Sequence, residues 1–213
     1  MVPTRKLSVA GVALLTLALA GCKNGDIASE LKITRSACPA VAVPAYTGDV
    51  TLFDPPASRE ARAIDVVANI SNLTSSCNSG TDPITAEANF EVSARRTNTA
   101  GARDVTLPYF ATVVRAGTRV TAKSLSRVTL HFDDGAAVAR STGTARIDVS
   151  ASAAKLPADI EAKINRKRKA GDEDAAIDPM SDPTVRAAVQ NASFELLVGF
   201  QLTEDQLKYN ATR

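Results

Sequence analysis

Short stretches in which apolar and polar residues alternate are the feature that most constrains how this chain can fold. In 64–71 the even positions are apolar, and in 88–95 the even positions are again apolar. In 144–150 the apolar residues are the odd ones. Successive side chains of a β-strand point to opposite faces, so a period of two is typical of a strand with one buried face. We therefore predict half-buried strands at these three places.

Further apolar stretches separated by turn-forming residues extend the pattern along the chain. More strands are expected at 49–53, 105–114, 120–123, 128–132 and 194–202, of which the last is the most apolar and should be central. Pro108 cannot donate a ladder hydrogen bond, so its strand should lie at a sheet edge or carry a bulge. The composition of 72–80 predicts a loop. About seven short strands favour a mainly β fold, an antiparallel immunoglobulin-like sandwich.

The period of the apolar residues changes before the last strand. One stripe with helical spacing carries Leu156, Ile160 and Ile164. Pro157 suits the first turn of that helix, and Asp182-Pro183 should begin a second one. Thr203 and Gln206 have the spacing of a capping box for a last helical turn. We expect a small helical insertion at about residues 155–191, before the last strand.

The first 21 residues have the organisation of a secretory signal peptide. Arg5 and Lys6 precede an apolar stretch from Leu7 to Ala20. This stretch is shorter than the roughly 20 apolar residues that a membrane-spanning helix needs. We therefore predict a signal peptide at 1–21.

The stretch ends in Leu19-Ala20-Gly21-Cys22, which resembles the lipobox of bacterial lipoproteins. The resemblance covers residues 1–22 and includes the pattern of Leu, two small residues and Cys. In that family the chain is cut before the cysteine, whose thiol receives a diacylglycerol and whose new amino group is usually acylated. The resemblance implies lipidation of Cys22 and attachment to a membrane through N-terminal acyl chains, at about 0.8 kcal/mol per buried CH₂. The alternative is an ordinary secreted protein in which Cys22 is incidental.

The resemblance also implies a location and a domain organisation. In enteric-type bacteria an Asp after the lipidated cysteine favours retention at the inner membrane, and this chain has Lys23 there. We therefore expect the protein in the cell envelope, at the periplasmic face of the outer membrane. Residues 22–36 would form the lipidated N-terminus and tether, and 37–213 the β-sandwich domain.

If Cys22 carries lipid, two cysteines remain for a disulfide. Cys38 and Cys77 would lie in an oxidising compartment, where paired thiols form disulfides. A metal or redox pair is the alternative, but neither a CxxC spacing nor a neighbouring histidine supports it. We therefore predict a structural disulfide between Cys38 and Cys77.

Charge and residue content argue against several functions. The net charge of +2 includes Arg5 and Lys6, so removal of the signal peptide leaves no net charge and no argument for nucleic acid as a partner. His131 is the only histidine and should face outward between Leu130 and Phe132, which argues against His-dependent triads and zinc sites. We expect no enzyme activity, no cofactor and no metal.

The most unusual charged segment is Arg166-Lys167-Arg168-Lys169, followed by acidic residues at 172–174. One interpretation is a patch for anionic lipid or a partner, worth about 1 kcal/mol per cation at a charged surface. A second is a calcium loop with Asp172, Asp174 and Asp178, although the spacing fails the EF-hand pattern. The third is a helix end followed by a self-compensating acidic loop. Arg95-Arg96 and Arg115/Arg119 are interpreted as exposed strand and turn positions.

These features resemble the small envelope lipoproteins of Gram-negative bacteria. The first hypothesis is a non-catalytic interaction or structural module that binds an envelope protein or cell-wall component. The alternative is a lipid- or small-ligand-binding lipoprotein whose sandwich opens around an apolar cavity. An enzyme that uses Asp/Glu pairs, such as a glycan hydrolase, is a third and weaker hypothesis.

Overall fold

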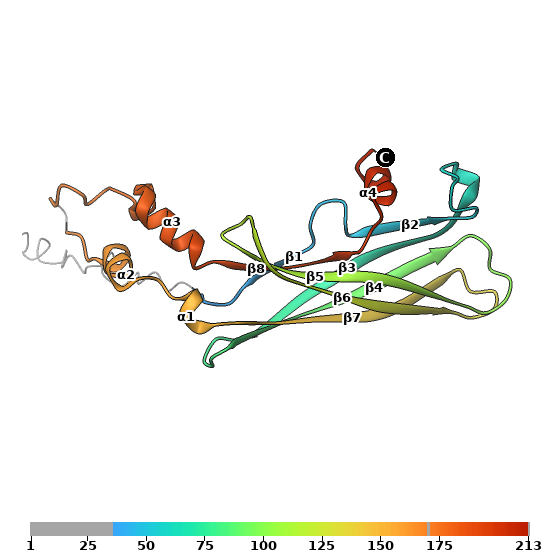
Figure 1. Cartoon of the computed structure of the whole chain (residues 1–213), viewed down its shortest axis with the longest axis horizontal. Coiled ribbons are helices and arrows are strands. Elements are labelled where there is room, and N and C mark those ends of the chain that lie inside the picture. Colours follow the sequence, from blue (N-terminus) through green and yellow to red (C-terminus); the bar gives the residue numbers. More distant parts are fainter. Residues whose placement is uncertain (1–35, 170, 213) are drawn as a thin grey trace, which may run out of the picture.

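The protein is described here by a computed structural model, which covers residues 36–169 and 171–212 (Figure 1). The strands are β1 (Ala40–Ala42), β2 (Asp49–Phe53), β3 (Ile64–Asn78), β4 (Ile84–Arg96), β5 (Arg103–Arg115), β6 (Arg119–Phe132), β7 (Val138–Val149) and β8 (Phe194–Phe200). The α-helices are α1 (Ala151–Ala154), α2 (Ala158–Asn165), α3 (Pro183–Asn191) and α4 (Glu204–Thr212), with 3₁₀ turns η2 (Ala61–Ala63) and η3 (Pro179–Ser181). The prediction of a mainly β fold is confirmed.

The strands form two four-stranded sheets. One has the order β1-β8-β5-β6 and the other the order β2-β3-β4-β7. Every pair is antiparallel except β1 and β8. The inner faces of both sheets supply one apolar core, which includes Val66, Phe90, Val92, Leu107, Leu130, Phe132, Leu196 and Val198. The fold is therefore sandwich-like, and β8 lies in the interior of its sheet as predicted.

The alternation of the sequence sets which face of each strand is buried. In β4 all even residues from Ile84 to Ala94 are buried, and in β7 the odd residues Ala145 and Val149 are buried. A shift of one residue would move every one of these side chains to the solvent face. The predicted inward positions of 64–71, 88–95 and 144–150 therefore agree with the structure.

The predicted loop at 72–80 is wrong over most of its length. β3 continues to Asn78 and pairs with β4, after a bulge between Ser71 and Thr74 that includes Asn72 at φ 51°. From Thr74 onward this arm is exposed to solvent. A strand that buries neither face can be built from Ser, Thr and Asn, because its backbone bonds are satisfied by the neighbouring strand.

Pro108 does not mark an edge strand, because β5 lies between β8 and β6. The register shift in the β5–β6 pair lies at Val113 and Val114, where β6 has Thr121 as an extra residue, away from Pro108. In an antiparallel pair the N–H and C=O of a residue face the same neighbour. The Pro108 carbonyl accepts from the Gln201 N–H, just beyond the end of β8. The N–H that proline lacks would point to the same side, toward Gln201, where the β8 strand has already ended.

The helical insertion lies between β7 and β8, and its helices gather at one end of the molecule (Figure 1). Ile160 of α2 and Val185 of α3 are buried. Asp182 caps α3 by accepting a hydrogen bond from the Thr184 N–H at 2.8 Å. The insertion therefore agrees with the predicted range of about 155–191, apart from the short α1 that precedes it.

The last helix, α4, is tied to the strands at the N-terminal side of the domain. Thr203 and Gln206 form the predicted capping box, in which each backbone N–H donates to the other side chain. The Asn210 amide donates to the carbonyls of Tyr46 and Asp49 at 2.9 and 2.8 Å. The helix is nine residues long, so it exceeds the single turn that was predicted.

Candidate functional site

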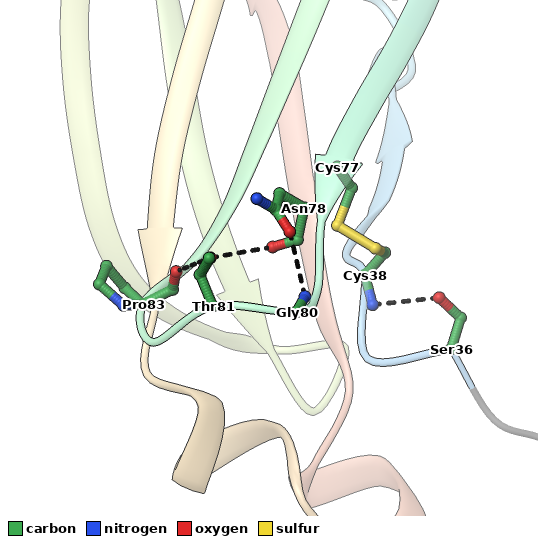
Figure 2. Close-up of a disulfide and its surroundings, with 7 residues drawn as sticks. All are labelled: Ser36, Cys38, Cys77, Asn78, Gly80, Thr81 and Pro83. Carbon is green, nitrogen blue, oxygen red and sulfur yellow. Dashed lines mark hydrogen bonds between the residues drawn. A yellow bond between two sulfur atoms is a disulfide. The ribbon is translucent and has the colours of Figure 1, made fainter.

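The N-terminal part of the described chain enters the fold through the Cys38–Cys77 disulfide (Figure 2). Cys38 precedes β1 of one sheet, and Cys77 lies near the end of β3 of the other. Ser36 accepts a hydrogen bond from the Cys38 N–H at 3.1 Å. The predicted disulfide is therefore present, and it joins the two sheets.

This disulfide lies at the same end of the sandwich as the helical insertion (Figures 1 and 2). The β3–β4 turn that follows Cys77 contacts α1, because Asp82 accepts a hydrogen bond from the Ala151 N–H at 3.0 Å. Cys22 and most of the tether 22–36 lie outside the described residues, so lipidation stays a prediction. No helix in the described part of the chain has the length and apolar character needed to cross a bilayer.

The basic segment 166–169 lies beyond α2, and two of its cations are neutralised locally. Arg166 is 2.5 Å from Asp174 and 3.9 Å from Asp172, and Arg168 is 3.5 Å from Asp174. Lys167 and Lys169 are exposed and form no ion pair with a described residue. The insertion 151–192 contains as many acidic as basic side chains. The geometry therefore favours the self-compensating loop over a strong anionic-lipid patch.

The acidic residues of this loop serve the local backbone. Asp172 accepts from the Lys169 N–H, and Asp178 accepts from the Met180 N–H at the start of η3. A hollow of about 200 Å³ next to them is lined by Arg166, Arg168 and Val185, among others. Within residues 36–169 and 171–212, no three His, Cys, Asp or Glu side chains are placed to hold a metal ion.

His131 lies on the outer face of β6, with 62% of its side chain exposed, as the alternation predicted. Its Nδ1 is 2.6 Å from Asp104, and its Nε2 is 3.4 Å from Asp133. The hydrogen bond to Asp104, followed by the attraction of the same carboxylate, raises the pKa of His131. The arrangement is an exposed ion pair between neighbouring strands at low pH.

We expect a single histidine titration by NMR with a pKa above 6.5, returning toward 6.5 in Asp104→Asn. The raised pKa means that this contact stabilises the fold fully below the unfolded-state pKa, and that the contribution is lost as the pH rises through the folded-state pKa. His131 is the only histidine, so its imidazole signals need no assignment by mutation. Equal pKa values in the wild type and Asp104→Asn would contradict the contact.

The end of the sandwich opposite the disulfide is organised by a buried arginine. Arg96 is 2% exposed and stands at the end of β4, about 40 Å along the strand from Ile84. Its guanidinium donates at 2.8 Å to the carbonyls of Thr99, Gly101, Asp133 and Ala136. The interpretation of Arg96 as an exposed position is therefore wrong, because it fixes the β4–β5 and β6–β7 turns from inside.

A shallow groove of about 420 Å³ lies beside these turns on the outer side. It is lined by Ile64, Val67, Arg95, Arg96, Thr97, Thr99 and Ala137. None of these residues belongs to the apolar core. Nearby, Arg103 makes a two-pronged ion pair with Asp65 across the sheets, at 2.9 and 2.5 Å. The groove is thus a surface feature beside the turns that bind Arg96.

A second exposed feature is the N-terminal part of β6, residues Arg119–Arg127. All nine residues are exposed, and β6 is the outermost strand of its sheet. The sequence predicts two separate strands, 120–123 and 128–132, whereas the structure has one continuous strand. The signal for this exposed feature was available, because 105–132 contains four Lys or Arg residues and no Asp or Glu.

Comparison of the chain with models of protein families found no match. Comparisons with curated proteins and with solved structures found no significant similarity either.

Proposed function

We propose that this chain is a lipid-anchored periplasmic module of the cell envelope, which binds or supports an envelope partner without catalysis. The observation that carries the proposal is the Leu19-Ala20-Gly21-Cys22 motif, combined with a disulfide that fixes where the tether meets the sandwich. Acyl chains at Cys22 would place the helical end of the sandwich nearer the membrane. The Arg96 turns would then form the distal end.

The length of the tether sets the reach of such a module. Residues 23–35 can span at most about 45 Å when fully extended. The sandwich adds roughly another 40 Å, the length of β4. A partner could therefore be contacted well away from the membrane surface, along the strands or at the distal turns.

The proposal includes an analogy between this fold and the immunoglobulin-like sandwich, and the analogy concerns the architecture alone. Two facing sheets of mostly antiparallel strands support it. The strand orders β1-β8-β5-β6 and β2-β3-β4-β7 are not the orders of an immunoglobulin constant domain. A sandwich of this kind is used by many binding proteins, but the architecture alone assigns no partner.

The ligand-binding alternative receives no support from the hollows described above. Neither hollow is lined by residues of the apolar core, where an enclosed lipid would have to lie. Both are open at the surface and bordered by charged side chains. We therefore retain the interaction module as the proposed function.

Expression of the full chain in a Gram-negative host tests the anchor. The wild type should incorporate labelled fatty acid and fractionate with membranes, whereas Cys22→Ser should lose the label and accumulate uncleaved. Lys23→Asp is the matched control, because it should keep the label and move toward the inner membrane in an enteric-type host. An unlabelled, soluble wild type would overturn the proposal of a lipid anchor.

The interaction itself is tested by crosslinking in intact envelopes followed by affinity capture of the full chain. We expect the same envelope component to be recovered in independent preparations from the wild type. It should be lost or reduced with Cys22→Ser, because the unanchored chain is no longer concentrated at the membrane. Recovery of no reproducible partner would contradict the proposed function.

A further inference from the structure

The outer edge of β6 has an unused hydrogen-bonding side along Arg119–Arg127. β6 pairs with β5 on one side, and no described strand pairs with it on the other. The backbone N–H and C=O groups of alternate residues on that side are therefore available to another strand. β1, at the opposite edge of this sheet, is only three residues long and offers much less backbone.

The same segment is exposed on both of its faces. Its inward-facing continuation, Val128, Leu130 and Phe132, is buried, whereas residues 119–127 are all exposed. Val120 and Leu125 are 60% and 64% exposed, and they pair with Val114 and Phe110, which lie on the same face of β5. Directly paired residues of neighbouring strands share a face, so an added strand would find both apolar side chains on one face.

The charge along the edge is of one sign. Lys123 and Arg127 pair with Thr112 and Pro108 of β5, so they point to the same face, about 13 Å apart. Arg119 pairs with Arg115, beyond a shift in the register, and points to the other face. The Lys123 ammonium lies 5.2 Å from the ring of Phe110, which holds it over the outer face. No carboxylate occurs between 105 and 132 to neutralise them.

We propose that Arg119–Arg127 of β6 is a docking edge for an acidic, extended polypeptide segment of the partner, which pairs with β6 as an additional strand. The proposal rests on the proposed function as an interaction module and names the surface and the chemistry of its partner. Main-chain hydrogen bonds would supply affinity, and the three cations would select acidic side chains on the facing strand.

The charge pattern argues against a second copy of this chain as the occupant. Pairing two β6 edges would bring the cations of one copy beside those of the other, and like charges on neighbouring strands are destabilising. Cations on an edge strand also discourage aggregation. An acidic strand is the pairing that these cations favour while they prevent self-association.

The test uses the full chain, purified with its anchor in detergent, and a fluorescent nine-residue peptide of alternating Glu and Val. We expect anisotropy to report binding that weakens with salt, and hydrogen exchange to slow at amides within 119–127. Arg119→Glu/Lys123→Glu/Arg127→Glu should weaken binding at least tenfold. Arg62→Glu/Lys155→Glu/Lys208→Glu carries the same change of net charge at exposed sites and should bind like the wild type.

Two further peptides separate strand pairing from simple charge attraction. A Lys/Val peptide should not bind, and a Glu/Pro peptide should bind much more weakly because proline cannot donate ladder hydrogen bonds. Equal binding of the Glu/Val and Glu/Pro peptides would overturn the proposal. So would binding of anionic vesicles through the same cations without any acidic peptide binding.

Failure of this inference can be distinguished from failure of the proposed function. If the captured envelope component crosslinks to another face, or binds the triple β6 variant as tightly as the wild type, the docking edge is wrong and the interaction module stands. If no partner is captured and the chain is not acylated, the proposed function itself fails. Circular dichroism of both triple variants verifies that each is folded.

Discussion

Replacing Arg96 with methionine should lower the free energy of unfolding by about 3–5 kcal/mol. Methionine fills similar volume and can still pack near Phe132, whose ring lies 5.2 Å from the guanidinium. It cannot donate hydrogen bonds, so the carbonyls of Gly101 and Ala136 lose their donor. The carbonyls of Thr99 and Asp133 lose one of two donors, because each also accepts from a backbone N–H. Each buried acceptor left unsatisfied costs roughly 1–3 kcal/mol, less where water can replace the donor. Urea denaturation followed by circular dichroism measures the change.

Arg95→Met is the matched control for this experiment. Arg95 is the preceding residue of β4 and is exposed on the opposite face, so its replacement should change stability by less than about 0.5 kcal/mol. Arg96→Lys should fall between the two, because an ammonium keeps the charge but cannot reach four carbonyls with a planar fork. Equal destabilisation by Arg95→Met and Arg96→Met would refute the central role of Arg96.

Arg96 also shows that the charge of a residue does not by itself predict whether its side chain is exposed. An arginine at a strand end is expected in solvent, because buried charges are rare unless they are paired. The alternation of β4 contained the opposite signal, since the inward even positions from Ile84 to Ala94 continue to Arg96. The turns that satisfy it come from residues 99–101 and 133–136, and no local pattern joins these segments. The alternation of β4 could predict that position 96 points inward, but it could not predict the distant carbonyls that bind Arg96.

The two sheets illustrate the same distinction. The alternating strands could be placed from sequence because burial of one face imposes a period of two. The exposed half of β3 could not be placed, and only 120–123 of the exposed part of β6 was predicted, because these segments bury neither face. They are strands because a neighbouring strand satisfies their backbone. The proposed docking edge lies in one of these halves, where sequence patterns are weakest.

The charged segment 166–169 could be recognised from sequence, but the ion pairs that neutralise part of its charge could be identified only from the structure. Four adjacent cations predict a basic surface when the local chain is considered alone. The turn at Gly171 brings Asp172 and Asp174 back to Arg166 and Arg168. Within the described residues, the cations of β6 keep no such acidic partner. The stronger positive surface is therefore on strand β6.

The second large effect concerns the disulfide: Cys38→Ser/Cys77→Ser should lower the free energy of unfolding by about 3–4 kcal/mol. The bond closes a loop with a sequence separation of 39, and its loss restores that conformational freedom to the unfolded chain. Urea denaturation should show the same loss when the wild type is treated with reductant, and no effect of reductant on the double variant. Ser36→Ala, which removes only the hydrogen bond from Cys38, should change stability by less than about 0.5 kcal/mol.

The same double variant should also loosen the entry of the chain into the sandwich. β1 contains three residues and pairs only with β8. The disulfide to β3 adds a covalent link to the second sheet on the N-terminal side of β1, besides the loop that leads to β2. We expect hydrogen exchange at Ala40–Ala42 to accelerate more than exchange in β4, which lies in the interior of its sheet. Uniform acceleration would show global destabilisation alone. Faster exchange confined to β1 would instead mean that the disulfide holds the tether at the end of the sandwich, which an anchored module requires in order to keep its orientation.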